Sequence, residues 1–196
     1  MVEYDLVEIF KSLQGEGRNS GRPAVFVRFA GCNLGCPWCD TPVARRFSLS
    51  LAELVDEIGS HCVKSVILTG GEPTIVAGMD ELVEALKNAG YWIGVETNAT
   101  GSPGWLGKVD YVACSPKAEY PGRIVLKKAH EVRIVASCPE TVGFARRVRG
   151  EIEATDYYIS PCDRDGKIDF ALAKAVLSQL DGWSLSVQLH KLLGFR

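Results

Sequence analysis

The stretch Gly31-Cys-Asn-Leu-Gly-Cys-Pro-Trp-Cys-Asp40 places three cysteines, Cys32, Cys36 and Cys39, in one short loop. Their spacing is C-x3-C-x2-C, and no fourth cysteine follows nearby. Three thiolates suit a [4Fe–4S] cluster in which one iron has no protein ligand, so that this iron can bind a small molecule through nitrogen and oxygen. The stretch therefore predicts a cluster site with one open coordination position.

Other interpretations of these cysteines are a disulfide, a zinc site or buried structural thiols. The total of seven cysteines is odd, and we expect no signal peptide, which disfavours a disulfide. Zinc accepts Cys3His sets at similar spacing, but the nearest downstream histidine is His61, beyond the loop. We expect the remaining cysteines to be reduced core or loop residues: Cys62, Cys114, Cys138 and Cys162.

Length and composition predict one domain spanning residues 1–196, because 46% of the residues are hydrophobic and can form a substantial core. The net charge is -2 and no basic stripe is present, so we expect no nucleic-acid partner. No apolar run approaches the ~20 residues that span a bilayer, so we expect no membrane segment. Oxygen-labile cluster chemistry fits a reducing compartment, and we expect a cytoplasmic protein.

Short β-branched runs alternate with longer amphipathic stretches along the chain. We expect strands over residues 24–30, 64–69, 92–96, 110–114, 131–135, 156–160 and 185–189, and helices over residues 50–60, 79–89, 140–148 and 170–180. Ser50 and Glu53 form a capping-box pattern, and Gly90 closes the second helix. The alternation predicts an α/β fold with a mostly parallel sheet and the chemistry at the carboxyl ends of its strands. The connection from residue 110 to residue 131 contains Pro and Gly and has no helical period, so one helix is expected to be missing.

Polar motifs follow three of the expected strands. In Thr69-Gly-Gly-Glu-Pro73 the glycines allow close backbone approach to a ligand, and exposed carbonyls with Glu72 suit a charged amino group. Glu96-Thr97-Asn98 and Ser115-Pro-Lys117 offer hydroxyls and an ammonium, which can serve a ribose and a carboxylate. The alternative is a tight strand-to-helix turn for the first motif and ordinary loop capping for the others.

The cysteine spacing, followed two elements later by the Gly-Gly-Glu motif, resembles the radical S-adenosylmethionine superfamily. The resemblance implies a partial (β/α)6 TIM-like barrel with one or more helices reduced or missing. It also implies that the methionine amino and carboxylate groups chelate the open iron, and that cleavage of the sulfonium gives a 5′-deoxyadenosyl radical. The implied cofactor contacts are Trp38, Cys39, Asp40, Gly71, Glu72, Ser115, Pro116, Lys117 and Ser160. Ser160 precedes Pro161 at a place where many members have Gln, so a hydroxyl replaces an amide beside the adenosine.

Four further segments resemble the 7-carboxy-7-deazaguanine synthase family: Ser12-Leu-Gln-Gly-Glu-Gly17, Arg28, Cys39-Asp-Thr41 and Gln188-Leu-His190. The resemblance covers nearly the whole chain. It implies a lyase that converts 6-carboxy-5,6,7,8-tetrahydropterin to 7-carboxy-7-deazaguanine with loss of ammonia, on the route to queuosine or archaeosine. No residue is assigned as a catalytic acid or base.

A pterin presents an exocyclic amine, a ring N–H and a carbonyl, which Gln14 and Glu16 can pair with. Arg28 can form a bidentate pair with the substrate carboxylate. The alternatives are a solvated turn for the first two residues and a solvent-facing strand arginine for the third. The implied substrate contacts are Leu13, Gln14, Gly15, Glu16, Arg28, Thr69, His190 and the terminal carboxylate of Arg196.

The resemblance also implies that the Thr41 hydroxyl ligates Mg2+, which keeps few protein ligands; the alternative is an ordinary loop residue. A homodimer and a reductant such as flavodoxin or ferredoxin are implied as partners. Two other functions are considered. A glycyl-radical activating enzyme shares the loop and barrel but acts on a protein, and a non-enzymatic iron–sulfur or zinc module has no need for Thr69-Gly-Gly-Glu-Pro73.

Overall fold

The computed structural model describes residues 2–164 and 166–195, and a nine-stranded sheet organises this part of the chain. The strand order is β11-β8-β7-β6-β5-β4-β2-β1-β3. The parallel strands are β2 (Pro23–Phe29), β4 (Ser65–Gly70), β5 (Trp92–Thr97), β6 (Tyr111–Cys114), β7 (Glu131–Ala136), β8 (Asp156–Pro161) and β11 (Ser184–Leu185). At one edge β1 (Glu3–Leu13) runs antiparallel to both β2 and β3 (Phe47–Ser50). A separate two-stranded ribbon joins β9 (Asp163–Arg164) and β10 (Lys167–Ile168).

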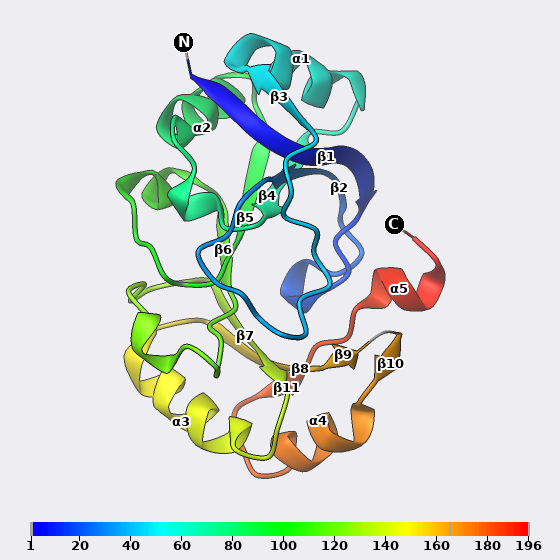
Figure 1. The fold of residues 1–196 in the computed structure, drawn as a ribbon, viewed down its shortest axis with the longest axis vertical. Helices are drawn as coiled ribbons and strands as arrows, with labels where there is room; N and C mark the ends of the chain where they lie inside the picture. The colour runs from blue at the N-terminus through cyan, green and yellow to red at the C-terminus, as the bar shows by residue number, and fades with distance from the viewer. Residues whose placement is uncertain (1, 165, 196) are drawn as a thin grey trace.

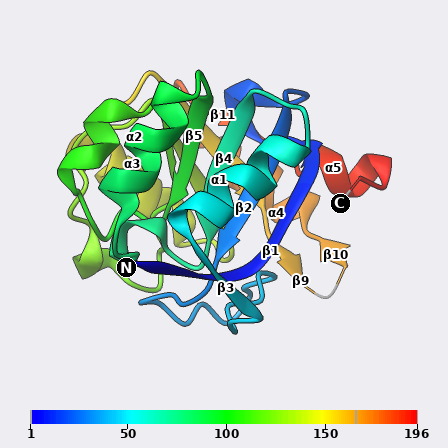
Figure 2. The same cartoon turned by 90° about the horizontal axis from the view of Figure 1, so that it is seen from above.

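Figure 1 shows the sheet as a curved wall, with helices outside the curve and the long loop after β2 inside it. The helices are α1 (Leu51–Ser60), α2 (Met79–Asn88), α3 (Thr141–Glu151), α4 (Phe170–Leu177) and α5 (Leu189–Leu193). Figure 2 shows α1 and α2 lying against the strands, and α5 standing apart beside β1. Within the described residues, no helix is both long and apolar enough to cross a bilayer.

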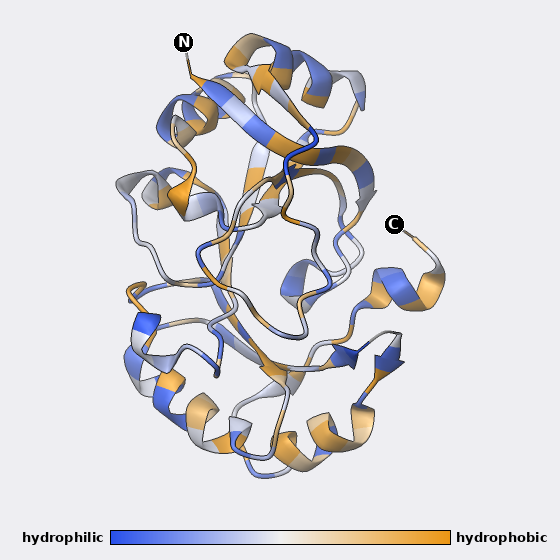
Figure 3. Ribbon diagram, in the orientation of Figure 1, coloured by the Kyte–Doolittle hydropathy of each residue, from blue (hydrophilic) through white to orange (hydrophobic). Residues whose placement is uncertain are grey.

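Apolar side chains fill the space between the sheet and the outer helices. Leu54 and Ile58 of α1 and Leu82 and Leu86 of α2 are fully buried against the strands. A second group around β7, including Val132 and Ile134, packs against α3 and α4. Figure 3 shows hydrophobic residues along the central strands, whereas the outer helices carry both hydrophobic and hydrophilic residues. Burial of one face explains why these helices form where the 3.6-residue period predicts them.

The expected α/β alternation is confirmed. Six of the seven expected strands form within one residue of the expected ends, and four helices begin at or next to the expected residues. The link between β6 and β7 holds only a short 3-10 turn, Pro121–Arg123, so the expected missing helix is confirmed. A second helix is reduced as well, because a 3-10 turn, Gly104–Lys108, takes its place between β5 and β6.

The strand expected over residues 185–189 is wrong. Strand β11 ends at Leu185, and α5 begins at Leu189. The physical reason is a tertiary contact, because the Leu189 amide donates to the Gly15 carbonyl at 2.9 Å and turns the backbone away from the sheet. The antiparallel strands β1 and β3 were not expected, although the buried and exposed residues of β1 largely alternate as in a strand with one covered face.

The capping box at the start of α1 generates a first prediction. The Glu53 amide donates to the Ser50 hydroxyl at 3.4 Å, and the Ser50 amide donates to the Glu53 carboxylate at 2.8 Å. Replacing Ser50 by Ala should therefore lower the free energy of unfolding by about 1 kcal/mol in urea titrations followed by circular dichroism. Ser60→Ala at the other end of α1, where the hydroxyl donates to the Glu57 carbonyl, is the matched control and should cost less. Equal losses in both variants would contradict the capping role.

Candidate active site

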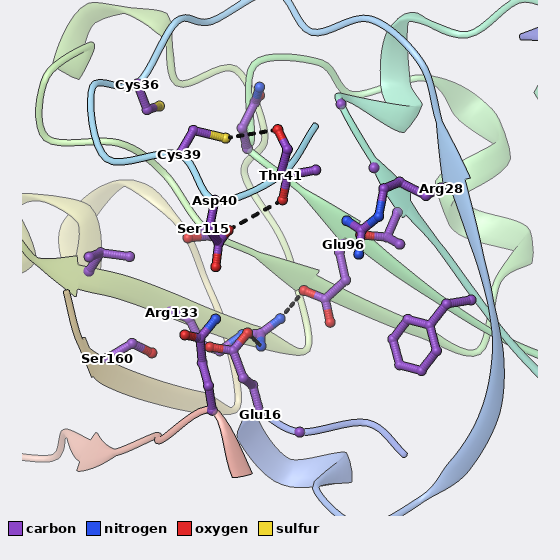
Figure 4. Close-up of a pocket in the computed structure, with 18 of the residues that line it drawn as sticks. Glu16, Arg28, Cys36, Cys39, Asp40, Thr41, Glu96, Ser115, Arg133 and Ser160 are labelled. Atoms are coloured by element: carbon purple, nitrogen blue, oxygen red, sulfur yellow. Dashed lines mark hydrogen bonds and ion pairs between the residues drawn. The ribbon is translucent and has the colours of Figure 1, made fainter. Parts of the chain in front are cut away.

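One cavity of about 690 Å³ opens at the carboxyl ends of the parallel strands, inside the curve of the sheet. Its lining comes from the end of β1, from β2, from the loop after β2, from the ends of β4 to β8 and from α5. Figure 4 shows Cys36 and Cys39 on one side of this cavity and Glu16, Arg133 and Glu96 on the opposite side. The cavity therefore joins a sulfur-bearing wall to a charged wall.

Cys32, Cys36 and Cys39 all line the cavity, and none of them forms a disulfide. Burial raises the pKa of the Cys36 thiol, and the charge of Lys117 acts in the opposite direction. The side-chain nitrogen of Asn98, Nδ2, lies 3.8 Å from the Cys32 sulfur. Among the described residues, no three Cys, His, Asp or Glu side chains converge on a position for a single metal ion. Three soft donors along one wall of a large cavity fit a [4Fe–4S] cluster, which is several atoms wide.

The turn after β4 packs directly against the start of the cysteine loop. The Gly71 amide donates to the Phe29 carbonyl at 2.9 Å, and the Glu72 amide donates to the Gly31 carbonyl at 3.0 Å. A Cβ atom on Gly71 would lie 1.5 Å from the Gly31 carbonyl oxygen, so only glycine permits this approach. The turn therefore sets the position at which the cysteine loop leaves β2.

Glu72 is an internal anchor and does not line the cavity. Its side chain is completely buried, and its carboxylate accepts hydrogen bonds from the Thr74 amide, the Thr97 hydroxyl and the Asn98 amide at 2.6 to 3.0 Å. The sequence assigned this carboxylate to a cofactor amino group, but here the protein's own donors hold it. Gly70 and Gly71 are the part of the motif that faces the cavity. Pro116 also lies outside the lining.

Polar groups beside the cysteines fit an adenosine-bearing cofactor. Lys117 Nζ donates to the Ser115 hydroxyl at 2.8 Å and lies 5.1 Å from the centre of the Trp38 ring. Ser160 lines the cavity, and its buried hydroxyl has no hydrogen-bond partner among the described residues. A buried polar atom without a partner is costly unless a ligand or water satisfies it. Ser160 therefore marks a place where a polar ligand atom fits.

An acidic cluster forms the wall opposite the cysteines. Gln14 Nε2 donates to Glu96 Oε1 at 2.7 Å, and Arg133 Nη1 donates to Glu16 Oε2 at 2.7 Å. Arg133 Nη2 pairs with Glu96, and Arg133 Nε lies 2.8 Å from Glu131 Oε1. This wall holds more carboxylates than guanidinium groups, so it suits a ligand edge that carries N–H donors.

Thr41 and Asp40 lie between the two walls, and α5 reaches them through Lys191. Lys191 Nζ lies 2.7 Å from both Asp40 Oδ2 and Asp163 Oδ2. Burial alone would raise the pKa of Asp40. The pKa is nevertheless lowered, mainly because Lys191 donates a hydrogen bond to this carboxylate and places a positive charge beside it. The Thr41 hydroxyl lies 3.4 Å from Asp40 Oδ1 and lines the cavity. These two residues offer hard oxygen atoms of the kind that Mg2+ prefers.

His190 closes the cavity next to the loop of Gln14 and Glu16. A Cβ atom on Gly15 would lie 1.9 Å from His190 Nδ1, so the ring packs directly on the loop backbone. Burial lowers the pKa of His190, although the charge of Glu16 opposes the shift. Across the cavity Arg28 Nε donates to Glu8 Oε1 at 2.8 Å. Arg196 lies outside the described residues.

Most residues that the sequence assigned to substrate, cofactor or metal line this one cavity. They are Leu13, Gln14, Gly15, Glu16, Arg28, Cys32, Cys36, Trp38, Cys39, Asp40, Thr41, Thr69, Gly71, Ser115, Lys117, Ser160 and His190. Sequence reasoning missed Arg133 and Lys191, and gave Glu96 only a general place at a strand end. The signal for Arg133 is the run Glu131-Val-Arg133, in which two charged residues at a spacing of two share one face of a central strand.

Comparisons with known proteins show which family and fold this chain is similar to. Residues 26–112 match the family model described as Radical SAM superfamily. The chain is 42% identical to a 7-carboxy-7-deazaguanine synthase of Haemophilus influenzae over 97% of this chain and 93% of that protein. It is 40% identical to a protein of the same name from Neisseria meningitidis, over 98% and 94% of the two chains. The fold is similar to that in the crystal structure of QueE from Escherichia coli, with a TM-score of 0.76, 23% identity and coverage of 96% and 95%.

The close approach of Gly71 generates a second prediction. Gly71→Ala should reduce the iron bound per chain after anaerobic reconstitution by at least about half, because the new methyl group displaces the start of the cysteine loop. Gly104→Ala is the matched control, since a Cβ atom there meets no atom within 4 Å, and it should bind iron normally. Normal iron content in Gly71→Ala would contradict the proposed packing.

The half-buried His190 ring generates a third prediction. The ring should titrate below its ordinary pKa of 6.5 and therefore be neutral at pH 7, because burial disfavours the charged form. Labelled-histidine NMR of the three histidines, with His190→Gln to assign the signal, measures this directly. A His190 pKa above 6.5 would show that Glu16 outweighs burial.

Proposed function

The chain belongs to the 7-carboxy-7-deazaguanine synthase family, and on that premise we propose that it converts 6-carboxy-5,6,7,8-tetrahydropterin to 7-carboxy-7-deazaguanine with loss of ammonia. The observation that carries the proposal is a single cavity with three cysteines on one wall and the Gln14, Glu16 and Glu96 side chains on the other. The cavity can therefore hold the cluster and S-adenosylmethionine at one wall and the pterin, with its N–H donors, at the opposite wall.

Cys32, Cys36 and Cys39 would hold the [4Fe–4S] cluster, and S-adenosylmethionine would lie beside it. When bound, the cluster and S-adenosylmethionine supply a 5′-deoxyadenosyl radical, which removes a hydrogen atom from the substrate. The carbonyls of Gly70 and Gly71 would accept from the amino group of the cofactor, and the unpartnered Ser160 hydroxyl would suit its adenosine. Lys117 and Ser115 add a positive charge and a hydroxyl at the same wall.

The acidic wall orients the heterocycle. Glu16 and Glu96 accept hydrogen bonds from the exocyclic amine and the ring N–H of the pterin, while Gln14 complements the carbonyl side. Arg28, on the neighbouring strand β2, pairs with the substrate carboxylate. Neutral His190 packs against this loop and can donate or accept one hydrogen bond without adding charge. The substrate is thereby fixed at both ends before any bond changes.

A Mg2+ ion would be held by the Thr41 hydroxyl, with substrate oxygens and water completing its coordination. Asp40 lies next to Thr41 and is anchored by Lys191, so the local oxygen atoms are fixed. Such an ion would neutralise the substrate carboxylate and hold it on the side of the cavity away from the acidic wall.

Several further features belong to the same proposal. The enzyme acts in the cytoplasm as a single-domain homodimer, receives electrons from a reductant such as flavodoxin or ferredoxin, and serves queuosine or archaeosine formation. Similarity over nearly the full length of named synthases favours the small-molecule substrate over a protein substrate.

Anaerobic turnover tests the proposal. The reconstituted protein is incubated with S-adenosylmethionine, reductant, Mg2+ and 6-carboxytetrahydropterin, and mass spectrometry should detect both 7-carboxy-7-deazaguanine and 5′-deoxyadenosine. Cys36→Ala should lose at least about 100-fold in rate, because the cluster loses one of three ligands. Cys138→Ala, at a cysteine outside the cavity lining, should turn over normally. Formation of 5′-deoxyadenosine without the deazapurine would reject this substrate and keep the radical chemistry.

A further inference from the structure

The acidic wall is built in two layers that differ in exposure. The side chains of Glu16 and Glu96 are 24% and 22% exposed and line the cavity. Arg133 also reaches the cavity lining, but its side chain is only 4% exposed, and Glu131, outside the lining, is 1% exposed. The two outer carboxylates are therefore more accessible to a ligand than Arg133, which contacts them from the inner side.

Arg133 contacts three carboxylates of its own chain. Its Nη1 donates to Glu16, its Nη2 pairs with Glu96, and its Nε forms an ion pair with Glu131. Glu16 follows the first strand, whereas Glu96 belongs to β5. One planar guanidinium therefore fixes the separation of two carboxylates that come from distant parts of the sequence.

Glu131 extends this support to the loop that carries Glu16. Its Oε2 accepts from the Arg18 amide and from the Tyr111 hydroxyl, both at 2.8 Å. Gly17 has a φ of +63°, and a Cβ atom there would lie 1.9 Å from Glu131 Oε1. The loop backbone therefore rests directly on Glu131.

We propose that Arg133, held by Glu131, is a positioning residue that sets Glu16 and Glu96 as a matched pair of hydrogen-bond acceptors for the aminopyrimidinone edge of the substrate. This inference deepens the proposed function and rests on it. A carboxylate oxygen can accept more than one hydrogen bond, so the oxygens that Arg133 and Gln14 hold can still accept from a ligand. Without the guanidinium, three carboxylates would face one another, and repulsion would separate the acceptor pair.

The test measures binding apart from turnover, using 6-carboxypterin, the oxidised and unreactive form of the substrate, as the probe. Its fluorescence is titrated with reconstituted wild type, Arg133→Met, Arg133→Lys and Arg22→Met. Arg133→Met should bind about tenfold more weakly or worse, and Arg133→Lys should recover part of the loss because it restores the charge without the fork. Arg22 contacts Ser65 and the Trp92 ring outside the cavity lining, so Arg22→Met is the matched control and should bind as wild type.

A second set of readouts separates positioning from a purely structural role. Arg133→Met should keep the iron content of the wild type and its slow, substrate-free formation of 5′-deoxyadenosine, while its KM for the tetrahydropterin rises more than its kcat falls. Wild-type affinity in Arg133→Met overturns the proposal, and so does an affinity loss matched by equal losses of iron and of substrate-free cleavage. Should Arg133→Met fail to fold, Arg133→Lys decides alone, and wild-type binding by that variant overturns the proposal.

The same titration distinguishes failure of the proposed function. If wild type binds no 6-carboxypterin and forms no deazapurine, the proposed function fails and the role of Arg133 falls with it. If wild type binds the probe and the Arg133 variants bind equally well, only the role of Arg133 is rejected.

Discussion

The completely buried carboxylate of Glu72 joins the carboxyl ends of the central strands, and the cavity depends on it. Its oxygens accept from Thr97 and Asn98 at the end of β5, while its own amide donates to Gly31 at the end of β2. Burying a carboxylate is costly unless donors satisfy it, so the segments that supply those donors are held together. Asn98 then contacts Cys32, which links the network to the first cysteine.

The same physical rule shapes the opposite wall of the cavity. There the buried charge is Arg133, and its partners are carboxylates from three separate segments. Both walls therefore use one buried ionic group to order several chain segments. The walls differ in what they present, because the Glu72 network turns backbone and thiols toward the cavity and the Arg133 network turns carboxylates toward it. The cavity therefore has one wall of thiols and backbone groups and an opposite wall of carboxylates.

The C-terminal helix α5 completes the cavity without belonging to the sheet. Its start is bound to the Gly15 carbonyl through the Leu189 amide, and Lys191 bridges Asp40 and Asp163. The segment after β1 and the C-terminal helix thereby meet beside the cysteine loop. Gly15 permits this arrangement because any side chain there would occupy the place of the His190 ring. A short helix is marginal alone, so these tertiary contacts hold it.

The sequence alone determined the α/β alternation, the cysteine loop and most of the cavity lining, because periodicity, helix caps and cysteine spacing are local signals. It also assigned the Gly-Gly-Glu turn to the site, but not the buried role of Glu72. Only the tertiary structure decided that Glu72 faces inward, that Arg133 joins Glu16 to Glu96, and that residues after Leu185 leave the sheet. These outcomes depend on hydrogen bonds and ion pairs between residues that are far apart in the sequence. Such contacts form only when the strands pack side by side, so neighbouring residues in the chain do not predict them.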